Sequence, residues 1–561
     1  MIKKMVKKKK KGLRSLGGAS SVGGPKTSDK RPKFVEKLPP CTHNCPNHNK
    51  IREALMEVSL AEARGKTNEQ AMEQAFYTFL DTTPFPSTCG RVCPHPCETE
   101  CNRKEKDGAL GVNSFERHVG DFGLKKGLKP KKFTDEKRAE KVAIVGSGPA
   151  GLSCAYQLAR RGYPVTVFEA FPKGGGMLRY GIPDYRLPQD VLDGEIDRIR
   201  DMGVEIKYNT AVGKDIPLDQ VRKDYKAIFV GIGGHQGLKL RVEGEDAENV
   251  FTGTDFLHRV NCDEKVDVGD HVVVIGGGDT AIDAARVARR LGAKTTILYR
   301  RTRTEMPAIE EEIEGALEED VKIEFLAAPI AIDKNGGKAA GMKCQRMELG
   351  EPDASGRRRP VPIEGDTFDL KFSTLIAAIS QAPDFDGLEN LREGRDWIKI
   401  DAKGKTKEEA VYSGGDNVNL GLVVDAIFQG RVAAEAIHEQ ITGEPAPTPP
   451  QLELIKREKV KPEHHDEKKR AEVKHLGVGE RMGCMKTEIS STLTEEEALA
   501  EAKRCMSCGL CMECGKCWSF CQDGAIIKPF VKGEKYKFKM EFCKGCDKCA
   551  EVCPCGYIEM H

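Results

Sequence analysis

Long apolar runs, a hydrophobic leader and an excess of one charge are all missing from this sequence. No apolar run approaches the roughly 18 residues of a membrane-spanning helix, and no hydrophobic segment follows the basic start, as a signal peptide requires. The net charge is only +2, and no aromatic residues are interleaved with the amino-terminal lysines. These absences argue against membrane, secreted and nucleic-acid-binding proteins, and predict a soluble, cytoplasmic protein.

Cysteine is nearly absent from the middle of the chain. Of the 21 cysteines, only four lie between residues 101 and 505, and the others form patches at 41–101 and 505–555. A secreted disulfide scaffold would be short and would spread its cysteines evenly. The pattern therefore predicts two local metal regions in a reducing compartment.

The sequence around Gly146 has the pattern of a dinucleotide-binding turn. KVAIVGSGPAGLSCAYQLARRGYPVTVFEA predicts a strand, a glycine turn, a helix and a second strand that ends in Glu169. In this GxGxxG spacing, Gly146 allows the tight turn, Gly148 lets the backbone approach a pyrophosphate, and Gly151 lets helix and strand pack closely. Glu169 would accept hydrogen bonds from the ribose hydroxyls of an adenosine.

A second turn of this kind follows in HVVVIGGGDTAIDAARVARRLGAKTTILYRR. Two arginines end its second strand, where a site for NAD more often has a carboxylate, and arginine can pair with a 2′-phosphate. The site therefore favours NADPH over NADH, although arginines after a strand are also commonly just solvated. The predicted cofactor-binding residues here are Gly276, Gly278, Asp279, Thr280, Ala281, Arg300 and Arg301.

A third glycine segment explains why one chain would contain two dinucleotide sites. VYSGGDNVNLGLVVDAIFQG predicts a strand, a turn with Gly415 and Asp416, and a helix from about residue 422. It resembles the carboxyl-terminal FAD motif of two-dinucleotide flavoproteins, which implies that Asp416 binds the ribityl chain. The FAD domain would then be split by an inserted nicotinamide domain.

Several segments, taken in order, resemble the glutamate synthase small-subunit family. They include CGRVCPHPCETEC, GGGMLRYGIPDYRLP, GGGDTAIDAARVARRLGA and YRRTRTEMPA, and the similarity covers about residues 38–445. The family includes the amino-terminal part of dihydropyrimidine dehydrogenase and the large subunit of the bifurcating ferredoxin:NADP transhydrogenase. The resemblance implies an NAD(P)H-dependent flavoprotein with FAD, and places Gly175 and Gly176 in the flavin-contacting loop.

The amino-terminal cysteines depart from the family pattern. The family builds two 4Fe-4S clusters here and has a CxxC pair upstream, whereas no cysteine precedes Cys41 in this chain. Carried over by resemblance, the complete ligand set is Cys45, Cys93 and Cys97, with Glu116 where relatives use Gln or Glu. We therefore expect one amino-terminal cluster rather than two. A solvated helix carboxylate is the alternative interpretation of Glu116.

The carboxyl-terminal cysteines have the spacing of a two-cluster ferredoxin. The pattern C-x₂-C-x₂-C-x₃-C occurs twice, and in such proteins the fourth cysteine of each repeat ligates the other cluster. Zinc is the alternative, but two repeats at this spacing are typical of 4Fe-4S clusters. The predicted ligands are Cys511, Cys514, Cys517 and Cys553 for one cluster, and Cys543, Cys546, Cys549 and Cys521 for the other.

Cys505 and Cys508 are left outside these sets. A capping box predicts that the helix TEEEALAEAKRC carries them to the ferredoxin. In the family, a similar EA-RC-x-x-C segment supplies the first two ligands of the second amino-terminal cluster, the one that we do not expect in this chain. The pair would then join Cys41 and Cys101 around a cluster, in the same chain or a partner. The other interpretation is a pair of reduced thiols.

The predicted fold class is α/β, with two nested Rossmann-like domains between a small helical iron–sulfur domain and an α+β bacterial-type ferredoxin domain. The basic, then Gly/Ser-rich start cannot bury a core, which predicts disorder. The expected segments are the tail at 1–34, the helical domain at 35–135, FAD-domain parts at 136–250 and 373–445, the NAD(P)H domain at 251–372, a linker at 446–493, and the ferredoxin domain at 494–561.

These parts predict an NAD(P)H:acceptor oxidoreductase. A nicotinamide delivers two electrons as a hydride and a 4Fe-4S cluster accepts one, so FAD must stand between them. No acid–base pair is needed. Three clusters would carry the electrons to or from a redox protein docked at the ferredoxin domain, with the chain in a homodimer or a larger complex.

The identity of that partner stays open at this point. The fusion to a ferredoxin resembles iron–sulfur flavoproteins associated with dissimilatory sulfite reductase. The alternatives are an electron-transfer subunit of a 2-oxoacid oxidoreductase, an aromatic-acyl reductase or a glutamate synthase complex, or a redox-inert scaffold.

Overall fold

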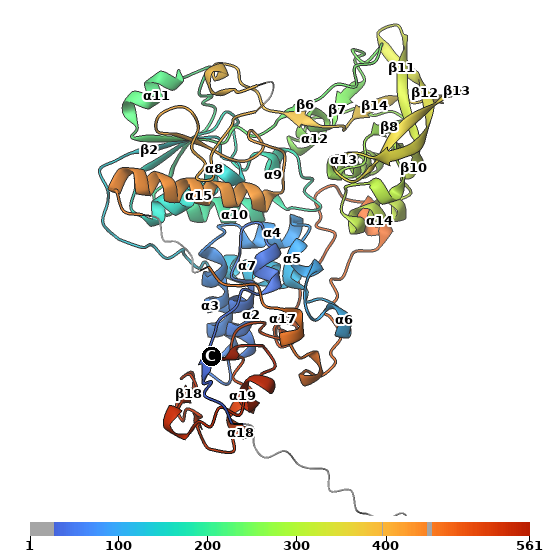
Figure 1. The fold of residues 1–561 in the computed structure, drawn as a ribbon. Coiled ribbons are helices and arrows are strands. Elements are labelled where there is room, and N and C mark those ends of the chain that lie inside the picture. The colour runs from blue at the N-terminus through green and yellow to red at the C-terminus, as the bar shows by residue number, and fades with distance from the viewer. Residues whose placement is uncertain (1–26, 395–396, 446–450) are drawn as a thin grey trace, which may run out of the picture.

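A computed structural model describes residues 27–394, 397–445 and 451–561. Two sheet-containing lobes lie at one end of the molecule, a group of short helices occupies the middle, and the carboxyl-terminal cysteine region lies at the other end (Figure 1). Within the described ranges, no helix is both long and apolar enough to cross a bilayer.

The middle of the molecule is a helical domain built from the amino-terminal segment. A Thr67 to Gln70 capping box starts the helix at Asn68–Leu80. Two of its helices, α4 and α7, cross so closely that a Cβ on Gly120 would lie 2.3 Å from the Ser87 nitrogen. The helices are α1 (Pro40–Asn44), α2 (Ile51–Ser59), α3 (Asn68–Leu80), α4 (Pro86–Val92), α5 (Pro96–Thr99), α6 (Lys104–Asp107) and α7 (Val112–Lys125).

The first lobe is a parallel five-stranded sheet in the order β16-β5-β2-β3-β4. Its edge strand β16 comes from a segment about 180 residues after β5, so the domain is split by an insertion. Its elements are β2 (Val142–Val145), α8 (Pro149–Arg160), β3 (Val165–Phe168), α9 (Met177–Tyr180), α10 (Gln189–Arg200), β4 (Glu205–Lys207), α11 (Leu218–Asp224), β5 (Ala227–Val230), β16 (Val411–Ser413) and α15 (Val423–Thr442).

The second lobe is a parallel sheet in the order β10-β9-β8-β14-β7, with a three-stranded antiparallel sheet attached. Its strand β14 lies beyond the boundary expected at residue 372. Its elements are β7 (Val250–Thr252), α12 (Gly253–Asn261), β8 (His271–Ile275), α13 (Asp279–Arg290), β9 (Lys294–Tyr299), η1 (Arg303–Glu305), α14 (Glu310–Glu318), β10 (Lys322–Phe325), β11 (Ala327–Asn335), β12 (Lys338–Pro352), β13 (Arg358–Lys371) and β14 (Thr374–Ala377).

Short elements join the lobes. Strands β6 (Gln236–Gly237) and β15 (Gln381–Ala382) pair antiparallel where the chain enters and leaves the second lobe, and η2 (Glu389–Leu391) follows. The two nested parallel sheets give the predicted α/β class, with each glycine turn at the carboxyl end of a strand.

The carboxyl-terminal region packs on the start of the chain. Strand β1 (Pro32–Phe34) pairs antiparallel with β19 (Ile558–Met560), so residues 27–34 are ordered, unlike the expected disordered tail. Residues 1–26 lie outside the described residues. The remaining elements are η3 (Arg457–Lys459), η4 (Pro462–His464), α16 (Val478–Met482), α17 (Glu495–Ala502), α18 (Lys516–Ser519), β17 (Ile526–Ile527), β18 (Lys537–Phe538), η5 (Met540–Phe542) and α19 (Lys548–Glu551).

Helix α17 belongs to the core of the helical domain, although its position in sequence suggested the ferredoxin domain. Ala498 and Ala502 are fully buried in one cluster with Leu55, Phe76 and Phe115. Their small side chains let α17 lie against α2 and α7. The predicted ferredoxin domain would therefore begin after Cys508 rather than at residue 494, since Cys505 belongs to the same buried cluster.

Candidate functional site

The first glycine turn is built for a close backbone approach. Gly146 has a φ of 94°, and a Cβ there would lie 2.3 Å from the Gly231 carbonyl oxygen. A Cβ on Gly151 would lie 2.0 Å from the Gly146 oxygen, so α8 can pack on β2 only without a side chain there. Gly148 is the N-cap of α8, which leaves the first N–H groups of the helix facing the space beyond the turn.

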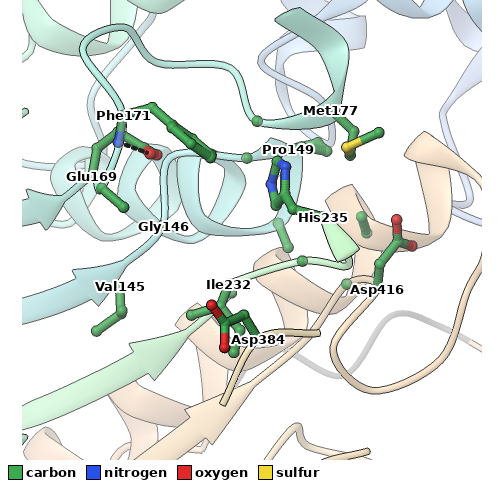
Figure 2. Close-up of a pocket in the computed structure, with 18 of the residues that line it drawn as sticks. Val145, Gly146, Pro149, Glu169, Phe171, Met177, Ile232, His235, Asp384 and Asp416 are labelled. Carbon is green, nitrogen blue, oxygen red and sulfur yellow. Dashed lines mark hydrogen bonds between the residues drawn. The ribbon is translucent and has the colours of Figure 1, made fainter. Parts of the chain in front are cut away.

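The Glu169 carboxylate is held at the end of β3. It is buried, and it accepts hydrogen bonds from the Ser147 N–H at 2.8 Å and the Phe171 N–H at 2.8 Å. Glu169 and Asp416 lie on opposite sides of one pocket, with the His235 ring between them (Figure 2). The structure thus brings both predicted FAD-binding carboxylates to one cavity.

A second glycine loop closes this pocket. Gly176 lines it with a φ of 55°, and a Cβ on Gly176 would lie 2.8 Å from the Gly148 α-carbon. Gly175 has a φ of 122°, and its N–H donates to the Ser147 carbonyl at 3.0 Å. The two loops therefore form a narrow backbone cradle that side chains would fill.

Asp416 stands in a partly apolar environment. Burial raises the pKa of its carboxyl to about 6, and the Gly421 N–H, which donates to Oδ1 at 3.3 Å, acts in the opposite direction. Its neighbour Gly415 has a φ of 83°, and its N–H donates to the Gln429 side chain at 2.6 Å. The turn thus fixes Asp416 in the pocket wall, where it can accept from hydroxyl groups.

His235 is a lining residue that the motifs did not indicate. Burial, with a smaller contribution from His258, lowers its pKa to about 4, so the ring is neutral near pH 7. Its ring centroid lies 5.2 Å from that of Phe171. No local pattern in the sequence distinguishes this histidine, because its role depends on where the chain crosses the pocket.

The second turn lines a second pocket. Gly276 has a φ of 148°, and a Cβ there would lie 2.3 Å from the Ala378 oxygen, while Gly278 is the N-cap of α13. Ala281 is fully buried. Asp279 accepts a hydrogen bond from the Ile309 N–H at 3.0 Å, which fixes the loop after η1 over the turn. The predicted residues that line this pocket are Gly276, Gly278, Thr280, Arg300 and Arg301.

The two arginines differ in their surroundings. Arg301 is buried, and its guanidinium already donates to Asp353 at 2.7 Å and to the Arg358 carbonyl at 2.7 Å. Arg300 is exposed and makes no ion pair within the described part of the chain. Arg357, from the turn between β12 and β13, also lines the pocket. Arg300 and Arg357 are therefore the freer cations for a 2′-phosphate.

The two pockets meet. Asp416 and Gly421 line both of them. The Gln381 side chain, in the wall of the second pocket, donates to Asp416 Oδ2 at 3.5 Å. A ligand in one pocket can therefore contact a ligand in the other across these residues.

The predicted amino-terminal ligands lie together below the first lobe. Cys45 and Cys97 are buried and Cys93 is partly buried, and the three thiols are close enough for their charges to interact. Burial is the main cause that raises the pKa of Cys45 to about 11 and of Cys93 to about 12. Glu116 is buried beside Cys45 and Cys93, and burial raises its pKa to about 8. Asn49 donates to it at 3.3 Å.

The ferredoxin cysteines fall into the two predicted sets. Cys517 interacts electrostatically with Cys511, Cys514 and Cys553, and Cys549 does so with Cys543, Cys546 and Cys521. Among the described residues, no three His, Cys, Asp or Glu side chains could hold a single metal ion.

Comparison with known proteins gives the same organisation. A model for pyridine nucleotide-disulphide oxidoreductases matches residues 140–430. A model described as dihydropyrimidine dehydrogenase domain II, 4Fe-4S cluster, matches residues 35–128. The first model spans more than half of the chain.

Three curated relatives are similar over long segments. The chain is 43% identical over 361 residues to the β subunit of an NADPH-Fe(3+) oxidoreductase of Geobacter sulfurreducens, which is 63% of this chain and 52% of the relative. It is 40% identical over 440 residues to the β subunit of an NADP(+)-dependent formate dehydrogenase of Moorella thermoacetica, covering 73% and 61%. It is 36% identical over 428 residues to the small chain of glutamate synthase (NADPH) of Escherichia coli, covering 71% and 88%.

The match thus spans about half of the first relative's length and most of the glutamate synthase small chain. The predicted family resemblance is confirmed. The chain belongs to the pyridine nucleotide-disulphide oxidoreductase family, among the relatives of the glutamate synthase small chain, and has an amino-terminal region that matches a 4Fe-4S domain.

Proposed function

We propose that the protein is an NADPH-dependent iron–sulfur flavoprotein that exchanges electrons with a redox protein partner. The observation that carries this proposal is the shared wall of the two pockets at Asp416 and Gly421. Such a wall lets a nicotinamide ring from one pocket lie against an isoalloxazine ring in the other. The relatives from Geobacter, Moorella and Escherichia are named as enzymes that use NADPH or NADP(+), which favours NADPH here.

The first pocket fits FAD. Its cradle of Gly148 and Gly176 leaves room for a pyrophosphate beside the α8 N-terminus, and Glu169 offers a fixed carboxylate for the ribose. Asp416 would accept from the ribityl hydroxyls, and His235 covers the pocket as a neutral ring. A bound flavin supplies the exchange between two-electron and one-electron transfer that joins a nicotinamide to iron–sulfur clusters.

The protein's own residues would place and shield the reacting groups. The N-terminus of α13 and Arg300 would hold the phosphates of NADPH, so that its nicotinamide reaches the shared wall. Helices α4, α5 and α7 lie between the first lobe and the ferredoxin region (Figure 1). Cys93 directly follows α4, Cys97 lies in α5 and Glu116 lies in α7. The predicted ferredoxin ligands would then carry electrons to the far end of the molecule.

The ferredoxin region offers a surface for a protein partner. Four large aromatic side chains of this region are about half exposed or more, and together they would offer apolar area to a docked protein. They are Trp518, Phe520, Phe530 and Phe542. Dissimilatory sulfite reductase, a 2-oxoacid oxidoreductase, an aromatic-acyl reductase and a glutamate synthase large subunit are the partner classes to test.

Anaerobic purification and a dye assay test the proposal. We expect about one FAD per chain, no FMN, and reduction of a small artificial dye that depends on NADPH. The Cys262→Ser variant, altered at an exposed thiol far from the predicted ligand sets, is the matched control and should behave like the native protein. A protein that binds neither FAD nor NADPH would contradict the proposal and favour a redox-inert scaffold.

A further inference from the structure

Four cysteines from the two ends of the chain line one small pocket. Cys41 lies in α1 and Cys101 follows α5, while Cys505 and Cys508 follow α17, about 400 residues later in the sequence. None of the four belongs to the three predicted ligand sets. The rest of the lining is mostly apolar, so nothing else in this pocket explains why the thiols converge.

The placement of Cys505 and Cys508 is firmly determined by packing. Ala498 and Ala502 fill the core of the helical domain, as described above. Arg504 is 1% exposed and donates to the Asp107 carboxylate at 3.1 Å and the Gly108 carbonyl at 2.8 Å. The Arg103 guanidinium donates to the Arg504 carbonyl at 2.6 Å. The segment is thus held where its cysteines face Cys41 and Cys101.

The Cys505 turn has the same geometry as the turns of the predicted cluster ligands. The Ser507 N–H donates to Cys505 Sγ at 3.4 Å, and Ser507 has a φ of 50°. At three of the predicted ligand cysteines, the N–H of the residue two positions later also donates to the sulfur at 3.4 Å, with φ values of 42°, 57° and 69°. These pairs are His95 to Cys93, Glu513 to Cys511, and Gly545 to Cys543.

Such N–H to sulfur hydrogen bonds stabilise thiolates bound to iron, and a left-handed residue is needed to aim the N–H at the sulfur. A serine in this conformation is strained in a way that a glycine is not. A pair of reduced, unligated thiols would not require Ser507 to adopt this left-handed conformation. The turn therefore has the local structure of a cluster ligand pair.

We propose that Cys41, Cys101, Cys505 and Cys508 ligate a fourth 4Fe-4S cluster. The chain thus supplies from its carboxyl-terminal half the ligand pair that is missing before Cys41. Each thiol would release its proton as its sulfur binds iron. The expected number of clusters rises from three to four.

The surroundings suit a buried cluster. Asn102 Nδ2 donates to Cys508 Sγ at 3.3 Å, and the buried Arg52 donates to the Cys508 carbonyl at 2.9 Å. Cys505 is buried, and the Cys41, Cys101 and Cys508 thiols are close enough to it for electrostatic interaction.

The fourth cluster would bridge the others. Cys41 lies close enough to Cys97 to contribute to the raised pKa of Cys97. Cys508 lies three residues before Cys511, the first predicted ferredoxin ligand. The site therefore lies between the amino-terminal ligand set and the first ferredoxin set. This role as a carrier rests on the proposed function, whereas the presence of the cluster can be measured without any activity.

Metal and sulfide content test the inference. The anaerobically purified full-length protein should contain about sixteen iron atoms and about sixteen acid-labile sulfides per chain, and no zinc. The double variant Cys505→Ser, Cys508→Ser should lose about four of each while it keeps FAD and dye reduction. The control Cys262→Ser, Cys484→Ser removes two exposed thiols and should keep all of them.

About twelve iron atoms in the native protein, or an unchanged iron content in the double variant, would overturn the proposal. So would zinc in place of the missing iron. If the double variant fails to fold, Asn102→Ala gives an independent reading, because it removes only the donor to Cys508. It should keep the iron content and change the electron paramagnetic resonance signal or the potential of one cluster, and unchanged spectra would again overturn the proposal.

Discussion

The Gln381 side chain donates to the Asp416 carboxylate at 3.5 Å, at the place where the two dinucleotide pockets meet. This contact joins the two lobes, because Gln381 lies in β15 and Asp416 precedes α15. Gln381, in the wall of the proposed nicotinamide pocket, thus orients the Asp416 carboxylate, which also lines the proposed flavin pocket. The junction is the part of the molecule on which hydride transfer would depend.

Replacing Asp416 with Ala should weaken FAD binding. The carboxylate is the proposed acceptor for the ribityl chain, and losing one charge-assisted hydrogen bond costs about 1.5–3 kcal/mol, or about ten- to a hundredfold in affinity. FAD released on gel filtration gives the measurement. Asp384→Ala is the control, because Asp384 lines the same pocket but pairs with Lys214 at 3.1 Å. Equal FAD loss in both variants would contradict the role of Asp416.

Arg300 should discriminate NADPH from NADH. Its guanidinium has no ion pair among the described residues, so Arg300→Ala should raise the KM for NADPH about ten- to a hundredfold and spare NADH. Arg301→Ala should instead lower Tm with little effect on the ratio, because Arg301 is bound to Asp353. If Arg300→Ala changed the KM for NADPH and the KM for NADH equally, Arg300 would not bind the 2′-phosphate.

Gly430→Ala should destabilise the first lobe. A Cβ at this position would lie 2.1 Å from the Ala150 carbonyl oxygen, so α15 would have to move away from α8. Overpacking of this kind costs typically about 1–3 kcal/mol and should lower Tm in differential scanning calorimetry. Gly479→Ala in α16 is the control, since nothing lies within 4 Å of its added Cβ. A Tm that is the same in both variants would be inconsistent with this packing.

The glycine turns and the ferredoxin repeats were predictable because their signals are local. Gly146, Gly276 and the C-x₂-C-x₂-C-x₃-C spacings fix a backbone shape within a few residues. The pairing of Arg301 with Asp353 was not predictable, since it depends on how the antiparallel sheet folds back. The convergence of Cys505 with Cys41 was open for the same reason, as it depends on packing between segments about 460 residues apart.

Because Cys505 and Cys508 pack against the helical domain, the truncation that separates the ferredoxin region from the rest should begin after Cys508. Deleting residues 511–561 should leave NADPH-dependent dye reduction nearly intact and abolish electron delivery to a protein partner. The shortened chain should keep about eight iron atoms under the four-cluster proposal. Deleting residues 494–561 should also remove Ala498 and Ala502 from the core and lower Tm sharply. Dye reduction lost equally in both deletions would contradict the boundary drawn after Cys508.

The most direct test of the proposed electron path is anaerobic stopped-flow reduction of the Cys93→Ala protein by NADPH. Cys93 is a proposed ligand of the cluster set nearest the first lobe. Iron content and Tm would first establish that this variant is folded and keeps its ferredoxin clusters. The account predicts that dye reduction persists, while reduction of the ferredoxin clusters is lost or strongly slowed. Reduction of those clusters at the native rate would contradict it, because electrons would then pass from the flavin to the ferredoxin without the amino-terminal cluster.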